Sequence, residues 1–151
     1  MSDPALPSSI HAGAVLTGAT AVLILGASGS GKSRLAFALL NAAATGLLPF
    51  ARLVADDRAL LEAQNGRLLV RPAPALAGVL ELRGVGLLRF PHEPLAQVGL
   101  AIGLGETGDR LPEMNASWSH KGIKIPYLAC PPGVAPLPLL LGRLRGDAAA
   151  D

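Results

Sequence analysis

Residues 26–33 carry the clearest chemical signal in the chain. They read Gly-Ala-Ser-Gly-Ser-Gly-Lys-Ser and fit the phosphate-loop pattern G-x-x-x-x-G-K-[ST]. Glycines let backbone N–H groups approach phosphate oxygens, the lysine supplies a positive charge, and the serine hydroxyl binds Mg²⁺. The alternative is an ordinary glycine-rich turn between a strand and a helix. We expect a nucleoside di- or triphosphate to bind at Gly26, Ala27, Ser28, Gly29, Ser30, Gly31, Lys32 and Ser33.

The segments on either side of this loop are those that such a site requires. Residues 21–25, Ala-Val-Leu-Ile-Leu, are a short apolar run typical of a buried strand. Lys32 to Thr45 has helical spacing of apolar residues and is closed by Gly46. A strand, a glycine turn and a helix N-terminus together direct backbone N–H groups and the positive end of the helix dipole at one point.

The strand before the loop is predicted to have a hairpin partner. Ile10 to Thr17 reads as a strand, Gly18-Ala19 as a tight turn, and Thr20 to Leu25 as the returning strand. Most phosphate-loop domains begin on the loop strand itself. The pattern therefore predicts an α/β domain with a mixed sheet.

The rest of the chain reads as further strands followed by one helix. Asn65-Gly66 between two apolar runs is a strong hairpin signal. Residues 105–121 are expected to form a mobile polar loop. We expect a single domain over residues 1–151, with a flexible lead-in at 1–9 and a flexible tail at 146–151. The remaining predicted elements are an apolar strand over 52–57 that ends in two carboxylates, strands at 79–82, 97–104 and 123–130, and a helix at 137–145.

Three carboxylates are candidates to hold a metal ion or move a proton. Asp56 and Asp57 follow an apolar strand, where a carboxylate beside a phosphate loop holds Mg²⁺ or its bound water. The alternative is a solvated pair in a turn. Glu81 lies inside an apolar strand, where it needs a cation such as a metal or Arg83. The alternative is that Glu81 lies on the solvated face of that strand and has no functional role.

Two basic residues are weaker candidates. His11 opens the first predicted strand, where a histidine is more often structural than catalytic. Arg110 lies in the polar loop and has the chemistry to stabilise a transferring phosphate, although a lone loop arginine is usually solvated.

Composition excludes several other classes of protein. The net charge is only +2, and basic residues do not cluster with aromatic ones, which argues against nucleic acid as a partner. The single cysteine, Cys130, cannot form an internal disulfide and suits a buried apolar position. The apolar stretch at 12–27 is interrupted by glycines and threonines, so it is not a membrane helix, and the N-terminus lacks the basic region of a secretory signal. We expect a cytoplasmic protein.

Taken together, these motifs resemble the catalytic domain of the bacterial HPr kinase/phosphorylases. The family loop reads G-x-S-G-x-G-K-S, as residues 26–33 do, and His11 stands fifteen positions before it. Leu53 to Asp57 matches the family block L-V-A-D-D, and Leu80 to Gly86 matches L-E-[IL]-R-G-[LV]-G. Asp109 to Leu111 matches a D-R-L element. The chain looks like a short form that consists of this domain alone.

The resemblance implies a reaction and roles for residues. The reaction would be ATP- and Mg²⁺-dependent phosphorylation of a serine on HPr, the phosphocarrier of the sugar phosphotransferase system, or on its nitrogen-branch paralogue. Asp57 would be the general base, and Ser33 and Glu81 would hold Mg²⁺. The implied fold is the mixed-sheet phosphate-loop variant shared with phosphoenolpyruvate carboxykinases. The basic residues implied near the transferring phosphate or the acceptor are Lys32, Arg110 and His11.

The sequence also departs from the family pattern. Where the family has V-R-P-G-R-N, a segment associated with dephosphorylation, residues 130–135 read Cys-Pro-Pro-Gly-Val-Ala. We therefore expect weak or absent phosphorylase activity, and formation of a homo-oligomer stays open. Two other functions also stay open: a small-molecule kinase, which would need a basic cluster for its acceptor, and a nucleotide-binding regulatory module without catalysis.

Overall fold

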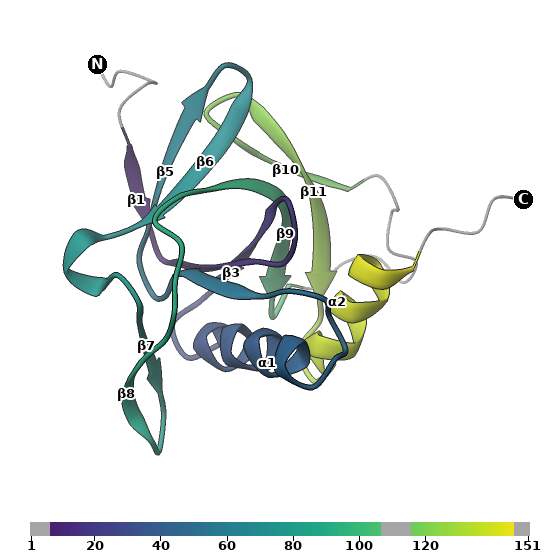
Figure 1. The fold of residues 1–151 in the computed structure, drawn as a ribbon. Helices are drawn as coiled ribbons and strands as arrows, with labels where there is room; N and C mark the ends of the chain where they lie inside the picture. Colours follow the sequence, from purple (N-terminus) through teal and green to yellow (C-terminus); the bar gives the residue numbers. More distant parts are fainter. Residues whose placement is uncertain (1–6, 107–115, 147–151) are drawn as a thin grey trace, which may run out of the picture.

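A curved mixed sheet with two helices on one side forms the body of the molecule. The structure is a computed structural model and describes residues 7–106 and 116–146. Helices α1 (Lys32–Ala44) and α2 (Pro136–Arg145) lie together against the sheet (Figure 1). The strand order is β1-β5-β6-β9-β3-β2-β4, with β11 also paired to β9 and β10 paired to β11.

The centre of the sheet holds three parallel strands that set the place of the phosphate loop. They are β3 (Ala21–Gly26), β9 (Ala96–Leu104) and β11 (Ile123–Cys130). Gly26 pairs with Leu104, and Leu104 with Cys130, so the three strands end at one edge of the sheet. β2 (Ala12–Leu16) and β4 (Arg52–Ala55) continue the sheet beyond β3 in antiparallel pairs. The predicted hairpin and mixed sheet are thus confirmed.

On the side of β9 away from β3, the sheet continues with antiparallel strands. β5 (Ala59–Gln64) and β6 (Arg67–Pro72) form the hairpin predicted at Asn65-Gly66. Asn65 and Gly66 adopt φ values of 52° and 75°, the left-handed conformations of a type I′ turn.

Two sequence predictions are wrong at the edges of the sheet. The lead-in was expected to reach residue 9, but β1 (Ser8–Ile10) pairs with β5, and the chain bends at His11 before β2 begins. The polar loop was expected to reach residue 121, but β10 (Ser117–His120) pairs with β11. Both strands are short and polar in part, so their partners rather than their composition determine them.

A separate hairpin projects from the body. β7 (Val79–Leu82) and β8 (Gly86–Arg89) form a two-stranded sheet, preceded by a 3₁₀ turn at Pro74–Leu76. The sequence predicted β7 but not β8. The turn between them uses Gly84 at φ 89°, and the hairpin extends away from the main sheet in Figure 1.

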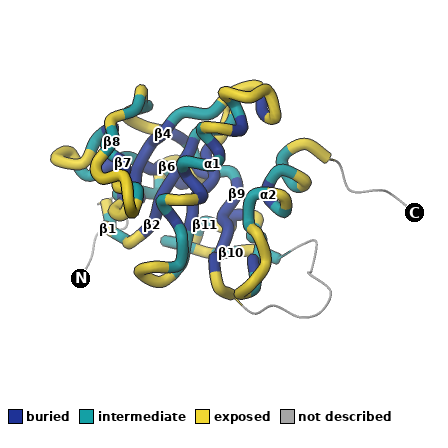
Figure 2. Tube along the Cα trace, turned by 90° about the horizontal axis from the view of Figure 1, so that it is seen from below, coloured by how far each residue is buried: buried dark blue, intermediate teal, exposed yellow. Residues whose placement is uncertain are grey.

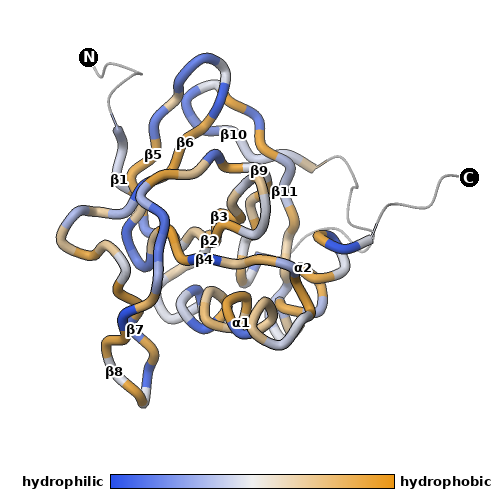
Figure 3. Tube along the Cα trace, in the orientation of Figure 1, coloured by the Kyte–Doolittle hydropathy of each residue, from blue (hydrophilic) through white to orange (hydrophobic). Residues whose placement is uncertain are grey.

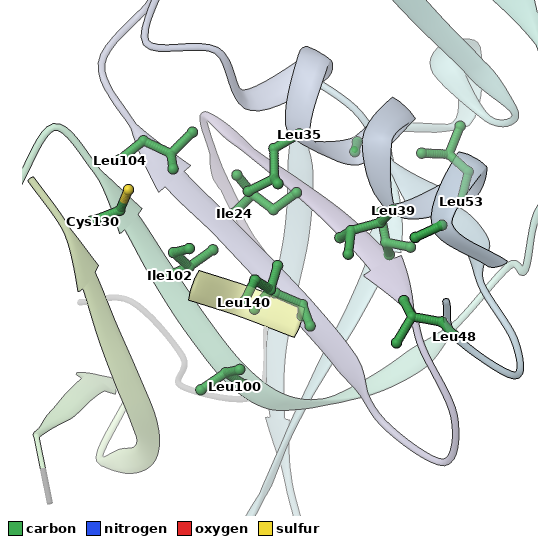
Figure 4. Close-up of a cluster of buried hydrophobic side chains, with 14 of the residues drawn as sticks. Ile24, Leu35, Leu39, Leu48, Leu53, Leu100, Ile102, Leu104, Cys130 and Leu140 are labelled. Atoms are coloured by element: carbon green, nitrogen blue, oxygen red, sulfur yellow. The ribbon is translucent and has the colours of Figure 1, made fainter. Parts of the chain in front are cut away.

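Each face of the main sheet packs its own apolar core. On the helix side, Leu35 and Leu39 of α1 and Leu140 of α2 meet Ile24 and Ile102 (Figure 4). Cys130 is also in this core, as predicted, and its burial raises the pKa of the thiol. The buried residues follow the central strands and the inner side of α1 (Figure 2). On the opposite side, alternate residues of the same strands pack with β5, β6 and β10; their larger members include Leu23, Val54, Leu61, Leu68 and Val70.

These packing patterns fix the phosphate loop in space. α1 is held by its apolar face and β3 by cores on both sides, so the turn that joins them has little freedom. Within the described residues, no helix is long and apolar enough to span a membrane. The α/β fold class predicted from sequence is confirmed.

Candidate active site

The glycine-rich loop folds back on itself and leads directly into helix α1. Ser30 N donates to Ala27 O at 3.0 Å, and Gly29 and Gly31 adopt φ values of 82° and 100°. Helix α1 begins at Lys32. Its N-cap residue, Gly31, has no side chain to cap the helix, and the first turn contains no acidic residue. Uncapped N–H groups and the positive end of the helix dipole make this an anion-binding end.

Lys32 is held at the base of the loop. Its side chain is buried, and Nζ donates to the carbonyl oxygens of Gly26 at 2.9 Å and of Ala27 at 3.0 Å. These neutral acceptors satisfy two of the three ammonium donors without neutralising the charge. The charge therefore stays available to a phosphate group at the loop.

Asp56 links the loop helix to the projecting hairpin. It is 4% exposed, accepts a hydrogen bond from Ser33 Oγ at 2.7 Å and another from Glu81 N at 3.1 Å. Burial raises the pKa of Asp56, the two hydrogen bonds offset part of that rise, and the neighbouring charge of Asp57 adds to it. A buried carboxylate against a helix-terminal serine hydroxyl is a suitable arrangement for a hydrated Mg²⁺.

Asp57 is exposed and lies in a tight turn. Its φ is 67°, and the turn is closed by Arg58 N, which donates to Asp56 O at 2.7 Å. The strand ends at Ala55, so strict alternation of side chains no longer applies, and both carboxylates reach the same cavity.

A cavity of about 430 Å³ brings Lys32, Ser33, Asp56, Asp57 and Glu81 together. Its wall combines the loop, three carboxylates and three basic side chains. Among these, Arg34 in the first turn of α1 is exposed and lines the cavity. A cation at this end of a helix opposes the helix dipole, and this was the sequence signal that could have marked it as a site residue. The charged residues of the wall are Lys32, Arg34, Arg83, Asp56, Asp57 and Glu81.

Some predicted residues that the structure describes do not line this wall: His11 and, in the loop, Gly26, Ala27 and Ser30. His11 is exposed at the bend between β1 and β2 and does not line the cavity. It lies near Asp57 along the backbone, because Ala12 N donates to Asp57 O at 3.2 Å. Arg110 lies outside the described residues.

The oxygen ligands of the cavity suit a Mg²⁺ ion that is also bound by the phosphates of a nucleotide. Among residues 7–106 and 116–146, no three His, Cys, Asp or Glu side chains converge to form a metal site by themselves. Mg²⁺ is usually held by one or two carboxylates together with substrate phosphates and water. Ser33, Asp56 and Glu81 fit that role.

Substitution of Gly26 tests the shape of the loop. An added Cβ would lie 2.4 Å from Ser30 Oγ and 3.2 Å from Leu104 Cβ. We expect Gly26→Ala to lower the free energy of unfolding by about 1–3 kcal/mol, as overpacking does. Ser30→Ala in the same chain should restore part of the loss, because Ser30 Oγ is buried without a hydrogen-bond partner. Chemical denaturation would measure this, with Gly18→Ala, where a Cβ meets nothing within 4 Å, as the control. Equal losses in the single and double variants would contradict the expected clash.

The buried Asp56 also predicts a pH dependence of stability. Its folded-state pKa is raised above the ordinary value of 3.8, so folding is more favourable with the carboxyl protonated. The favourable contribution of Asp56 to the free energy of unfolding is fully present below pH 3.8. It is lost as the pH rises through the raised pKa of the folded state. We expect Asp56→Asn to flatten the melting profile of the nucleotide-free protein against pH, because the amide does not titrate. Asp57→Asn should change the profile less, since its charge is a smaller cause of the shift. An unchanged profile in Asp56→Asn would contradict this assignment.

Comparison with known proteins agrees with this geometry. The family model for the HPr Serine kinase C-terminal domain matches residues 5–92. The chain belongs to this family. The matched range covers the loop, the Asp56-Asp57 turn and the β7–β8 hairpin of this HPr serine kinase domain.

A solved structure extends the match over most of the domain. The Hpr(Ser) kinase/phosphatase from Coxiella burnetii is 28% identical, with a TM-score of 0.71 over 91% of this chain and 93% of that chain. A comparison with curated proteins found no match. The family and the structural match support a role of the kinase/phosphatase type for this HPr serine kinase domain.

Proposed function

We propose that this protein is an ATP-dependent protein-serine kinase that phosphorylates an HPr-type phosphocarrier. The observation that carries the proposal is one cavity in which the glycine loop and Lys32 face Asp56, Asp57 and Glu81. Phosphoryl transfer needs a phosphate cradle, carboxylates for the metal and a group that accepts the proton of the acceptor hydroxyl. The glycine loop with Lys32, the carboxylates of Asp56 and Glu81, and Asp57 are the groups we propose for these three roles.

We assign a different role to each residue of the cavity, and the burial of its side chain guides the assignment. Bound Mg²⁺ would neutralise phosphate charge, held by Ser33, Asp56 and Glu81. Lys32 and the N–H groups of the loop would bind the phosphate oxygens and stabilise the charge that develops on them. Asp57, exposed at the cavity, would take the proton of the acceptor serine as its oxygen attacks the γ-phosphorus. His11 and Arg110 are proposed near the acceptor or the transferring phosphate on the family resemblance alone.

A second candidate is a kinase that acts on a small anionic metabolite. It is favoured by Arg34 and Arg83, which line the same cavity and form no ion pair among the described residues. Two exposed arginines are suitable for a carboxylate or phosphate acceptor.

A transfer assay separates the candidates. The purified chain would be incubated with Mg²⁺, γ-labelled ATP and either an HPr-type carrier or a panel of anionic metabolites. Label in the carrier at a rate that saturates with carrier concentration is the expected result. Label in a metabolite alone would favour the second candidate, and nucleotide binding without transfer would point to a regulatory module.

The turn after β11 supports a preference for the forward reaction, from ATP to the carrier. Phosphorolysis requires inorganic phosphate beside the phosphoserine, so that a phosphate oxygen attacks its phosphorus and the serine leaves with a proton from Asp57. The turn lies at the sheet edge where β3 ends, as the strand register shows. Its Pro131, Pro132 and Val134 contribute no charge, and the prolines offer no N–H.

We therefore expect little pyrophosphate when phosphoserine carrier is incubated with Mg²⁺ and millimolar phosphate. A coupled pyrophosphate assay would measure it against the forward rate under matched conditions. Release as fast as the forward transfer would overturn this part of the proposal.

A further inference from the structure

The β7–β8 hairpin exposes two large apolar side chains beside the cavity. Val85 is 64% exposed and Leu87 is 73% exposed, the highest values among the exposed large apolar residues of the described chain. Figure 2 shows the hairpin as largely exposed, and Figure 3 shows apolar residues along much of it. We define the hairpin surface as Arg83, Val85, Leu87 and Arg89.

The two faces of the hairpin have different roles. Leu80 is fully buried and Leu82 packs against the helix-side core, so this face anchors the hairpin. The strand register places Leu87 directly opposite Glu81, on the other face. Since Glu81 lines the cavity, Leu87 shares its face with the site of phosphoryl transfer.

Folding does not account for the apolar residues of this surface. Val85 and Leu87 belong to neither buried cluster and are not part of the cavity wall. Exposed apolar patches rimmed by polar groups mark sites of protein–protein contact. A small acceptor inside the cavity would not reach them, whereas a protein that presents a side chain to the cavity would cover them.

The charge of the surface specifies the partner further. Arg83 and Arg89 are exposed and have no carboxylate within ion-pair distance among residues 7–106 and 116–146. Unpaired cations beside an apolar patch complement apolar residues flanked by acidic ones.

We propose that the hairpin surface is the docking site for the acceptor protein. The acceptor places an apolar side chain near its phosphorylated serine against Val85 and Leu87, and carboxylates near Arg83 and Arg89. This inference rests on the proposed function. It assigns acceptor recognition to an element that is separate from the phosphate loop.

Steady-state kinetics with a carrier protein would test it. Leu87→Ser, alone and combined with Val85→Ser, should raise KM for the carrier about tenfold or more, with kcat and nucleotide-induced thermal stabilisation unchanged. Arg89→Glu should raise KM and reduce its dependence on salt. Leu47→Ser is the matched control, because Leu47 is 44% exposed and follows the opposite end of α1 from the loop.

Three outcomes would overturn the docking site. A fall in kcat and in nucleotide stabilisation for Leu87→Ser would show that the hairpin supports the cavity instead. Dissociation of an oligomer by the same variant, seen by sedimentation, would show that a second copy of the chain covers the surface. Direct titration of carrier into the chain keeps the two proposals distinguishable: binding that the double variant loses supports docking even if no transfer occurs, and absence of binding by the unmutated chain overturns it.

Discussion

Lys32→Ala is expected to abolish nucleotide-dependent stabilisation and to reduce phosphoryl transfer by about 10²- to 10³-fold. Lys32 is the buried cation at the base of the loop, and its only acceptors among the described residues are the carbonyl oxygens of Gly26 and Ala27. Removing it takes a positive charge from the point where phosphate charge develops. The fold should survive, because alanine is a good helix former at the first position of α1.

Thermal unfolding with Mg²⁺-ATP would measure the binding part of this prediction. At a ligand concentration of 100 Kd the unmutated chain should gain about 2.7 kcal/mol, or about 5–10 °C. The Lys32→Ala variant should gain almost nothing. Lys124→Ala, which removes an exposed lysine from β11, is the matched control. Equal stabilisation of Lys32→Ala and the unmutated chain would show that the nucleotide does not bind at this loop.

Asp57→Asn is expected to keep nucleotide binding and to lower kcat by about 10²- to 10⁴-fold, since an amide cannot accept the serine proton. Asparagine tolerates left-handed backbone conformations, so the φ of 67° at this position should be preserved. The loss should therefore report chemistry rather than misfolding.

Asp56→Asn provides the contrast. Its single amide oxygen cannot replace both acceptors that now meet Ser33 Oγ and Glu81 N. We expect a higher Mg²⁺ requirement with a smaller loss of kcat at saturating Mg²⁺. Magnesium titrations of both variants would separate the roles. The reverse ranking would place the general base on Asp56.

Local sequence signals predicted the centre of this protein well. The apolar run before Gly26, the helix from Lys32 and the Asn65-Gly66 turn all depend on neighbours within a few residues, and each is found where it was expected. The mixed sheet followed from the short connection between β2 and β3, which permits only antiparallel pairing.

Features that depend on distant partners were not predictable in the same way. Ser8–Ile10 is a strand because β5, about fifty residues later, offers it a free edge. Arg34 lines the cavity because the projecting hairpin encloses the far side of the site. The Asp56-Asp57 pair was identified from its position, but only the fold shows that Asp56 is buried against Ser33 while Asp57 is exposed.

Mapping of the modified residue tests the central proposal most directly. The chain would be incubated with Mg²⁺-ATP and an HPr-type carrier, and the carrier analysed by tandem mass spectrometry, with Lys32→Ala as the control enzyme. We expect a single phosphoserine in the carrier, formed by the unmutated chain and formed about 10²- to 10³-fold more slowly by the variant. The proposal would be contradicted if the carrier stayed unmodified after long incubation with excess nucleotide. It would also be contradicted if the variant phosphorylated the carrier as fast as the unmutated chain.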